Sequence, residues 1–351
     1  DGDTINLGGQ FLVSVTDDVP EPDVWVDDYV RIDETYGRHS DNVYNPVTGQ
    51  YNPNVVALFS GVTNPGSDSD LPGPIYARWD VVDFDANVGA DEPASTELAL
   101  RVDDPISELT TTEGDAITLS LVDGLVIGRI ASGDAVFAIH IDDFGRVSIV
   151  QYQSLHHPDT SSSDEHITLD GKISAILTVT DADGDAVSTE VSIGADVTFD
   201  DDGPQAYRQG SNSSMDEASD IGSLIAGELQ FDGGADGATV TSVSLATNGA
   251  NTVRGLDLEA SGPARRGDLT ADGEPITWSS STDGSGVITI DGVGGTSGTP
   301  AFQIVVQPDG SYTYQQFVAF DHPDAGETGT DDRLAIRMAF TVTDGDGDTD
   351  V

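Results

Sequence analysis

The chain has 351 residues, of which 63 are acidic and 13 are basic, so that its formal net charge is −50. This length is typical of two domains, and the charge excludes non-specific nucleic-acid binding because it would repel the phosphates. The chain has no Cys and no apolar run long enough for a bilayer. We therefore expect neither disulfides nor membrane insertion of this segment.

The ratio of Asp to Glu helps to explain why the chain is so acidic. Of the 63 acidic residues, 50 are Asp and 13 are Glu. Asp favours turns and calcium loops, whereas Glu favours helices. Disorder would account for the charge in a less apolar chain, but 37% of the residues are hydrophobic and they alternate regularly. Between solvation at high salt and cation binding, the clustering of Asp with Gly at repeated points favours cations.

Short β-strands are predicted along the whole chain. Apolar residues alternate with period two in the predicted strands at 136–141, 147–152, 173–179, 189–199, 301–306 and 334–342. Turns rich in Gly and Pro separate these strands, and no segment has a sustained helical period. The sequence therefore predicts an all-β fold of tandem immunoglobulin-like β-sandwich domains.

An internal repeat organises the chain. Three blocks recur at an offset of 165 residues, the difference between 322 and 157: the blocks 135–139, 143–147 and 157–159 return as 300–304, 308–312 and 322–324. Thr178–Asp185 returns as Thr341–Asp348, and Val13–Pro20 resembles Val197–Pro204. We predict the closing strands of a preceding repeat at 1–20, a β-sandwich repeat at 21–203 with an insertion at about 36–80, and a second repeat at 204–351. A boundary near residue 183 is the alternative.

Acidic clusters at the predicted ends of the repeats are the candidate metal sites. The segments 181–185 and 344–348 each place three Asp residues in one turn. They begin like an EF-hand loop, but the twelfth position of the first is Ser192 and not Glu. Carboxylates before and after Pro204 are placed to share an ion between repeats. The predicted calcium ligands are Asp17, Asp18, Asp33, Glu34, Asp181, Asp183, Asp185, Asp200, Asp201, Asp202, Asp216, Glu217, Asp344, Asp346 and Asp348.

Residues 36–80 have no counterpart in the second repeat. The segment is rich in Tyr, Asn and Pro, which suits sugar stacking and polar recognition. Two interpretations stay open, an ordered loop or a recognition surface on a rigid scaffold. The candidate ligand-binding residues are Tyr44, Tyr51, Tyr76 and Trp79.

No catalytic constellation is found in the sequence. His157 and His322 each begin a His-Pro-Asp tripeptide, which we interpret as a turn because no helices flank it. His156, His157 and His166 lack the usual spacing of zinc ligands. No nucleophile elbow stands between a predicted strand and a helix. We therefore expect no enzymatic activity.

The segments GRIASGDAVFAIHID and TVTDADGDAVSTEVSIGADVTFDDDGP resemble the repeats of giant type I-secreted bacterial RTX adhesins. The resemblance covers residues 1–35 and about 90–351. It implies a secreted protein of the bacterial cell surface for attachment and biofilm formation, with calcium-binding junctions that stiffen its modules. The expected role is a rigid extender whose partners are calcium ions and neighbouring repeats. The alternative is an adhesin module that recognises a host or microbial surface glycan or peptide through the insertion with calcium assistance.

Overall fold

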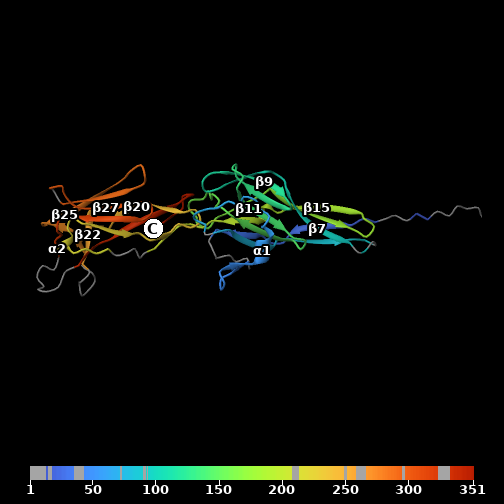
Figure 1. Ribbon diagram of the computed structural model, residues 1–351, viewed down its shortest axis with the longest axis horizontal. Helices are drawn as coiled ribbons and strands as arrows, with labels where there is room; N and C mark the ends of the chain where they lie inside the picture. Colours follow the sequence, from blue (N-terminus) through green and yellow to red (C-terminus); the bar gives the residue numbers. More distant parts are fainter. Residues whose placement is uncertain are drawn as a thin grey trace, which may run out of the picture.

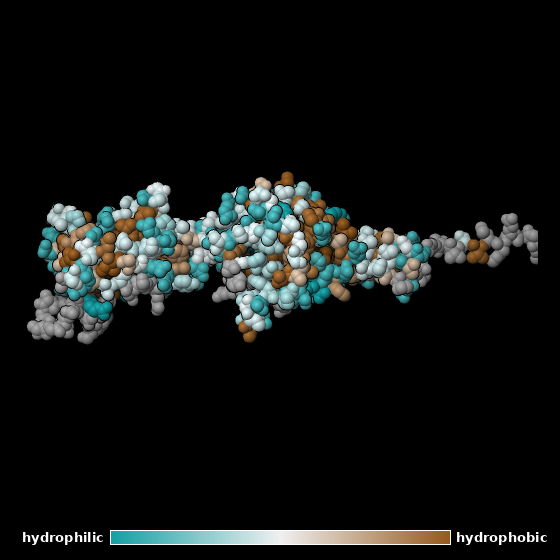
Figure 2. Space-filling model, viewed as in Figure 1, coloured by the Kyte–Doolittle hydropathy of each residue, from teal (hydrophilic) through white to brown (hydrophobic). Residues whose placement is uncertain are grey.

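The computed structural model describes residues 13–14, 18–34, 43–71, 73–89, 92, 94–207, 213–248, 251–257, 266–294, 297–322 and 333–351. Their regular structure is almost entirely β-strand, which confirms the all-β prediction. Two units follow each other along the long axis (Figure 1) and meet at a narrow waist (Figure 2). Within the described ranges, no helix is long and apolar enough to cross a membrane.

The first unit runs from β1 to β16. Its elements are β1 (Glu21–Val26), β2 (Val30–Asp33), β3 (Tyr44–Asn45), β4 (Gln50–Tyr51), α1 (Pro53–Leu58), β5 (Ile75–Asp80), β6 (Val82–Asn87), β7 (Ser95–Val102), β8 (Ile106–Thr110), β9 (Ala116–Val122), β10 (Leu125–Arg129), β11 (Ala135–Ile141), β12 (Arg146–Gln151), β13 (His166–Thr168), β14 (Ile173–Thr180), β15 (Ala186–Ser192), the 3-10 helix η1 (Gly194–Asp196) and β16 (Val197–Asp200).

A six-stranded sheet dominates the first unit, with strand order β5-β12-β11-β10-β9-β8. The smaller sheets β15-β14-β7 and β13-β16-β2 share one hydrophobic core with its inner face. Across that core the rings of Phe137 and Phe199 lie 5.0 Å apart, and both side chains are fully buried. Strand β16 runs parallel to β2, so that Val197 pairs with Val30 and Asp200 with Asp33.

The second unit repeats this arrangement. Its elements are β17 (Gln205–Ala206), α2 (Glu217–Asp220), β18 (Leu224–Glu228), β19 (Phe231–Asp232), β20 (Ala238–Leu245), β21 (Thr247–Asn248), β22 (Thr252–Asp257), β23 (Arg266–Asp268), β24 (Thr270–Ala271), β25 (Glu274–Thr282), β26 (Ile288–Gly294), β27 (Thr299–Val306), β28 (Ser311–Gln316), β29 (Leu334–Ile336), β30 (Met338–Asp344) and β31 (Thr349–Asp350).

The strand orders show the correspondence. The path β18-β28-β27-β26-β25 matches β5-β12-β11-β10-β9, and β20-β30-β31 matches β7-β14-β15. A separate hydrophobic cluster forms the core of the second unit. The sequence offset of 165 residues therefore pairs structurally equivalent strands. The domain limits at residues 20 and 203 stay a prediction.

Of the segment 36–80, β5 is an edge strand of the six-stranded sheet and corresponds to β18, whereas described residues before β5 cover the outer face of that sheet. Helix α1 and the hairpin β3–β4 form a second small core with Ala138, Val150 and Tyr152 on that face. At the offset of 165 residues the second unit has Gln303 and Gln315 in place of Ala138 and Val150. An uncovered sheet face needs polar residues, whereas a covered one needs apolar residues. The sequences of the two sheets therefore match the presence and absence of this cover.

Two predicted strands are interrupted. The strand predicted at 189–199 is split by η1, because Gly194 approaches the Leu169 carbonyl so closely that a Cβ would lie 1.9 Å from its oxygen. The strand predicted at 334–342 is split at Arg337 into β29 and β30. In both places alternation continues in the sequence while the chain changes its pairing partner.

Candidate metal centre between the two units

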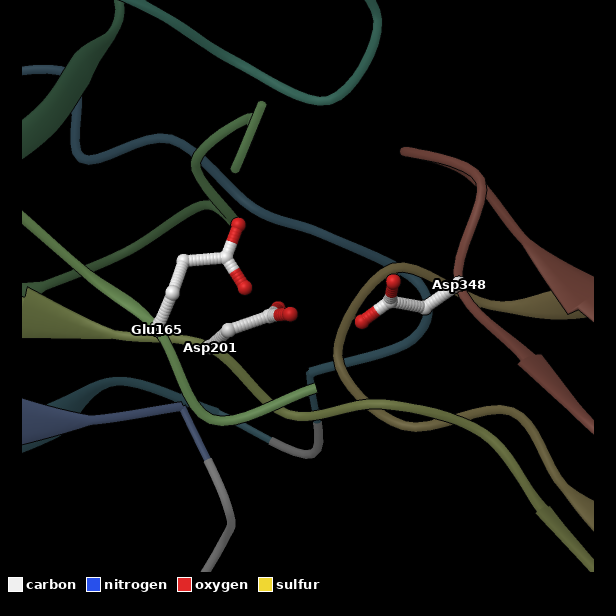
Figure 3. A group of neighbouring side chains, drawn as sticks. All are labelled: Glu165, Asp201 and Asp348. Carbon is white, nitrogen blue, oxygen red and sulfur yellow. The ribbon is translucent and has the colours of Figure 1, made fainter. Parts of the chain in front are cut away.

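Six acidic residues from both units gather at the waist, and we call them the junction cluster. The first unit contributes Glu165 and Asp201, and the second contributes Asp236, Asp344, Asp346 and Asp348. Figure 3 shows the carboxylate of Asp201 between those of Glu165 and Asp348. The six form three overlapping groups, in each of which one oxygen per residue lies within 4.8 Å of the others. Asp201 belongs to two of these groups, and both contain carboxylates of the second unit.

The local chain geometry explains how these carboxylates converge. Asp201 follows directly on β16, and its backbone N–H donates to the Glu165 carbonyl at 3.0 Å. Asp344 ends β30, and its Oδ1 accepts the backbone N–H groups of Gly347 and Asp348 at 2.9 and 2.7 Å. Gly347 has φ +111, a backbone conformation that residues other than glycine rarely adopt. The turn therefore holds three Asp residues on a rigid frame.

The junction cluster is buried and incompletely hydrogen-bonded. Asp201, Asp236, Asp344, Asp346 and Asp348 are between 2% and 8% exposed. Each of the five has one carboxylate oxygen without a hydrogen-bond partner among the described residues. A buried carboxylate without a partner is costly, and in proteins it either takes up a proton or binds a cation.

The pKa values of these carboxyl groups follow from that burial. Desolvation, followed by the charges of Asp346 and Asp236, raises the pKa of Asp201 to about 9. Desolvation also raises the pKa of Asp344 to about 8 and that of Asp236 to about 7. A bound cation attracts the carboxylates and so lowers their pKa values again. The cluster is therefore chemically suited to a metal ion.

The donor set favours calcium over other metals. All donors of the junction cluster are carboxylate oxygens, which hard cations such as Ca²⁺ prefer, whereas zinc prefers Cys and His ligands. Calcium accepts six to eight oxygens in flexible geometry, while magnesium requires a smaller octahedral site. Three overlapping groups of carboxylates offer more oxygens than one octahedral site needs, which matches the calcium pattern better.

A second acidic group lies at the opposite end of the first unit. Asp181, Asp183 and Asp185 form this end loop between β14 and β15 (Figure 1). Asp181 Oδ1 accepts the backbone N–H groups of Gly184 and Asp185 at 3.1 and 2.8 Å, as Asp344 does in the other loop. Asp181 is buried, whereas Asp183 and Asp185 are exposed. The end loop thus has the same hydrogen-bonded turn as Asp344–Asp348, but no carboxylate of a second described unit lies beside it.

The two predicted glutamate ligands each use one oxygen for structural hydrogen bonds. Glu34 is 1% exposed, and its Oε1 accepts from Gln151 and from the backbone N–H of Leu155 at 2.9 Å. Glu217 accepts in the same way from Gln316 and from Phe320 N at 2.9 Å. Each glutamate therefore ties the start of its unit to the residues after β12 or β28. Oε2 of Glu34 has no hydrogen-bond partner among the described residues, and burial, followed by the charge of Asp236, raises the pKa of Glu34. The role of both glutamates as metal ligands stays a prediction.

The other predicted ligands are not in the junction cluster. Asp200 forms an ion pair with Arg31, and its pKa is raised to about 6, mainly by burial. Asp33 lies beside it in β2, and Asp202 donates its backbone N–H to Asp201 Oδ1 at 2.8 Å. Asp18 is exposed close to Gly89, and Asp216 is exposed at the start of α2. Asp17 lies outside the described residues.

Sequence reasoning missed Asp236 and Glu165. Asp236 lies in the segment Gly233-Gly234-Ala235-Asp236-Gly237 directly before β20, and an Asp among glycines was a usable signal of a binding turn. Glu165 follows a run of Ser and has no pattern that distinguishes it from a solvated acid. Only the fold brings it to the linker.

The candidate ligand-binding residues divide into two sets. Tyr51 contacts Tyr44 and Tyr76, with ring centroids 5.1 and 5.0 Å apart. Tyr51 and Tyr76 line a groove of about 760 Å³ between α1 and the sheet. Trp79 does not join them, because it packs against the inner core and its Nε1 donates to Asp28 at 2.8 Å.

Comparison with known families adds one result. The family model described as a domain of unknown function, DUF5801, matches the chain twice, over residues 29–194 and 200–351. No curated protein and no solved structure matches the chain. The chain therefore belongs to the DUF5801 family of domains of unknown function.

Proposed function

We propose that this chain is a calcium-stabilised segment of a bacterial cell-surface adhesin of the RTX type, acting as a rigid extender in attachment and biofilm formation. Its two units are tandem immunoglobulin-like β-sandwiches with calcium at their junction. The observation that carries the proposal is the junction cluster, because buried carboxylates of both units meet there with unpartnered oxygens among the described residues. The secreted, cell-surface setting rests on the sequence resemblance.

Calcium would change the mechanics of the chain at this point. Units joined by a short linker move relative to each other unless their interface is strong. Without a cation, the carboxyl groups of Asp201 and of the Asp344–Asp348 loop either repel each other as anions or take up protons, and no ligand bond then joins the two units. A shared ion supplies ligand bonds from both sides and fixes the angle between the units. A stiff string of units holds a distant binding tip away from the cell, which is the purpose of an extender.

The test is small-angle scattering of the full chain with calcium, with magnesium and with a chelator. We expect calcium to lengthen and narrow the distance distribution, and magnesium to act weakly. The double variant Asp201→Asn/Asp346→Asn should lose this response. The matched control Asp83→Asn/Asp85→Asn removes the same charge from exposed positions of β6 and should keep it. A wild-type profile that is unchanged by calcium, or a junction variant that stiffens as the wild type does, would reject the proposal.

A ligand-binding module is the second candidate, and the groove beside α1 is the observation that favours it. Its volume is within the usual range for small-molecule sites, and Tyr51, Tyr76, Tyr152 and Phe59 line it. Aromatic rings of this kind stack on sugars or on peptide side chains. Glycan and peptide arrays should then bind the wild-type chain and not a Tyr51→Ala variant. If the wild-type chain gives no signal on the arrays, the ligand-binding function is rejected and only the extender role remains.

A further inference from the structure

The insertion reaches the junction through a row of contacting polar side chains. Asp68, in the insertion, accepts from the backbone N–H and the Oγ of Ser154 at 3.3 and 2.8 Å with the same oxygen. Ser154 is 1% exposed, and its Oγ lies 2.9 Å from Thr112 Oγ1. Thr112 also donates to Asp236 of the second unit. Four side chains thus connect the insertion to the junction cluster.

Counting hydroxyl protons fixes the direction of these bonds. Ser154 and Thr112 each have one hydroxyl proton, and the two carboxylates can only accept. Both carboxylates accept a hydrogen bond when Ser154 donates to Asp68 and Thr112 donates to Asp236. The 2.9 Å contact between the two hydroxyl oxygens then has no proton of its own and is a packing contact. Asp236 Oδ2 remains an oxygen with no partner in the described part of the chain. Asp236 shares a group with Asp201 and Asp346, so the arrangement leaves one of its oxygens available to that group.

The insertion also packs against the loop that contains Asp236. Gly237 has φ +63, and a Cβ there would lie 2.8 Å from Asp70 Oδ2. Leu71 and Ala235, one from each unit, both belong to the core of the first unit. The insertion therefore touches the second unit directly as well as through Ser154 and Thr112.

We infer that the insertion supplies the outer shell of the junction cation site, with Asp68, Ser154 and Thr112 acting as positioning residues for Asp236. This inference rests on the proposed calcium junction. Outer-shell partners fix the orientation of a ligand and strengthen its bond to the metal. The second unit has no such device, because only residues 218–223 separate Glu217 from β18. The junction after the first unit is therefore tuned differently from one that follows a unit without the insertion.

A pair of substitutions at Thr112 tests this role by calcium titration calorimetry of the full chain. Thr112→Val keeps the shape and removes the hydroxyl, whereas Thr112→Ser keeps the hydroxyl. We expect Thr112→Val to weaken calcium binding at the junction by about tenfold, the lower end of the range for outer-shell partners. Thr112→Ser should restore most of the affinity. Asp68→Ala, at a half-buried position of the insertion, should weaken binding in the same direction without a change in the core.

The controls separate this inference from the proposal beneath it. Asp83→Asn should leave the affinity unchanged, and melting in chelator should show that every variant is folded. Hydrogen exchange of the Ser154 backbone N–H should become faster in Asp68→Ala, since its acceptor is lost. Suppose that the wild type binds calcium and that Asp201→Asn/Asp346→Asn does not. If Thr112→Val and Asp68→Ala then bind calcium within twofold of the wild-type affinity, the outer-shell role is overturned. If the wild type itself binds no calcium, the proposed function fails first.

Discussion

Gly345 offers a sharp test of how closely the two units fit at the waist. A Cβ at this position would lie 2.4 Å from Thr112 Cγ2 and 2.8 Å from the Asp236 carbonyl oxygen. Neither distance is compatible with a real contact. Relief of the contact with Thr112 moves the loop of the second unit away from the first, whereas the contact with Asp236 lies within the second unit. Overpacking of this size costs about 1–3 kcal/mol. The part of this cost that arises from Thr112 shifts the docking equilibrium between the units, by about 150-fold at most.

The chain contains a natural control for this substitution. The end loop has Ala182 where the junction loop has Gly345, and in both loops the first Asp accepts the same two backbone hydrogen bonds. Gly345 does not have positive φ in the structure. The loop itself therefore tolerates Ala, and any cost arises from the contact with Thr112 and Asp236.

Scattering and calcium-dependent melting of the full chain measure the effect. Gly345→Ala should reduce the stiffening by calcium and lower the calcium-dependent rise in melting temperature. The reverse exchange in the end loop, Ala182→Gly, should change neither. A Gly345→Ala chain that stiffens at the same calcium concentration as the wild type would refute a close fit at this position.

Three further predictions concern metal, pH and packing. With sites of Kd ~10⁻⁴–10⁻³ M, ~10 mM calcium should stabilise the fold by about 1.4–2.7 kcal/mol per site; coinciding melts in calcium and chelator at fixed ionic strength would contradict this. In chelator, stability should fall as pH rises from about 4 to about 9, because burial raises the pKa of folded Asp201 to about 9 and the folded state then holds a proton that the unfolded chain releases. Asp201→Asn should flatten that slope in denaturant titrations across the pH range, and an unchanged slope would assign the protons to other groups. Phe199→Ala should cost about 3–5 kcal/mol in chemical unfolding, because Phe199 packs fully buried on Phe137; a loss below about 1 kcal/mol would show that this core is not tightly packed.

Much of the fold follows from the sequence because repetition and alternation are local signals. The recurrence of 135–139 as 300–304 identifies β11 and β27 as equivalent strands of the two units. The alternation in 173–179 marks the buried face of β14. The splits at Gly194 and Arg337 were not predictable from alternation, since a chain can keep its period while it changes its partner strand. The replacement of Ala138 and Val150 by Gln303 and Gln315 was a readable sign that the insertion covers one sheet and not the other.

The candidate metal centre was only partly predictable, for a physical reason. Asp344, Asp346 and Asp348 lie in one turn, and their proximity is therefore encoded by spacing alone. Asp236 and Glu165 reach the same place through tertiary structure, which a single sequence does not reveal. Glu34 and Glu217 have a structural role that spacing alone does not reveal, because one oxygen of each accepts from a Gln side chain and from a backbone N–H.

The parallel pairing of β2 with β16 has a consequence for a chain under tension. Force applied along the long axis pulls β2 towards the start of the chain and β16 towards its end. Because the two strands run in the same direction, from Val30 beside Val197 to Asp33 beside Asp200, all bonds between them are loaded in shear at once. An antiparallel pair pulled from one end would open one bond at a time. The first unit should therefore resist extension at the strand that leads into the junction.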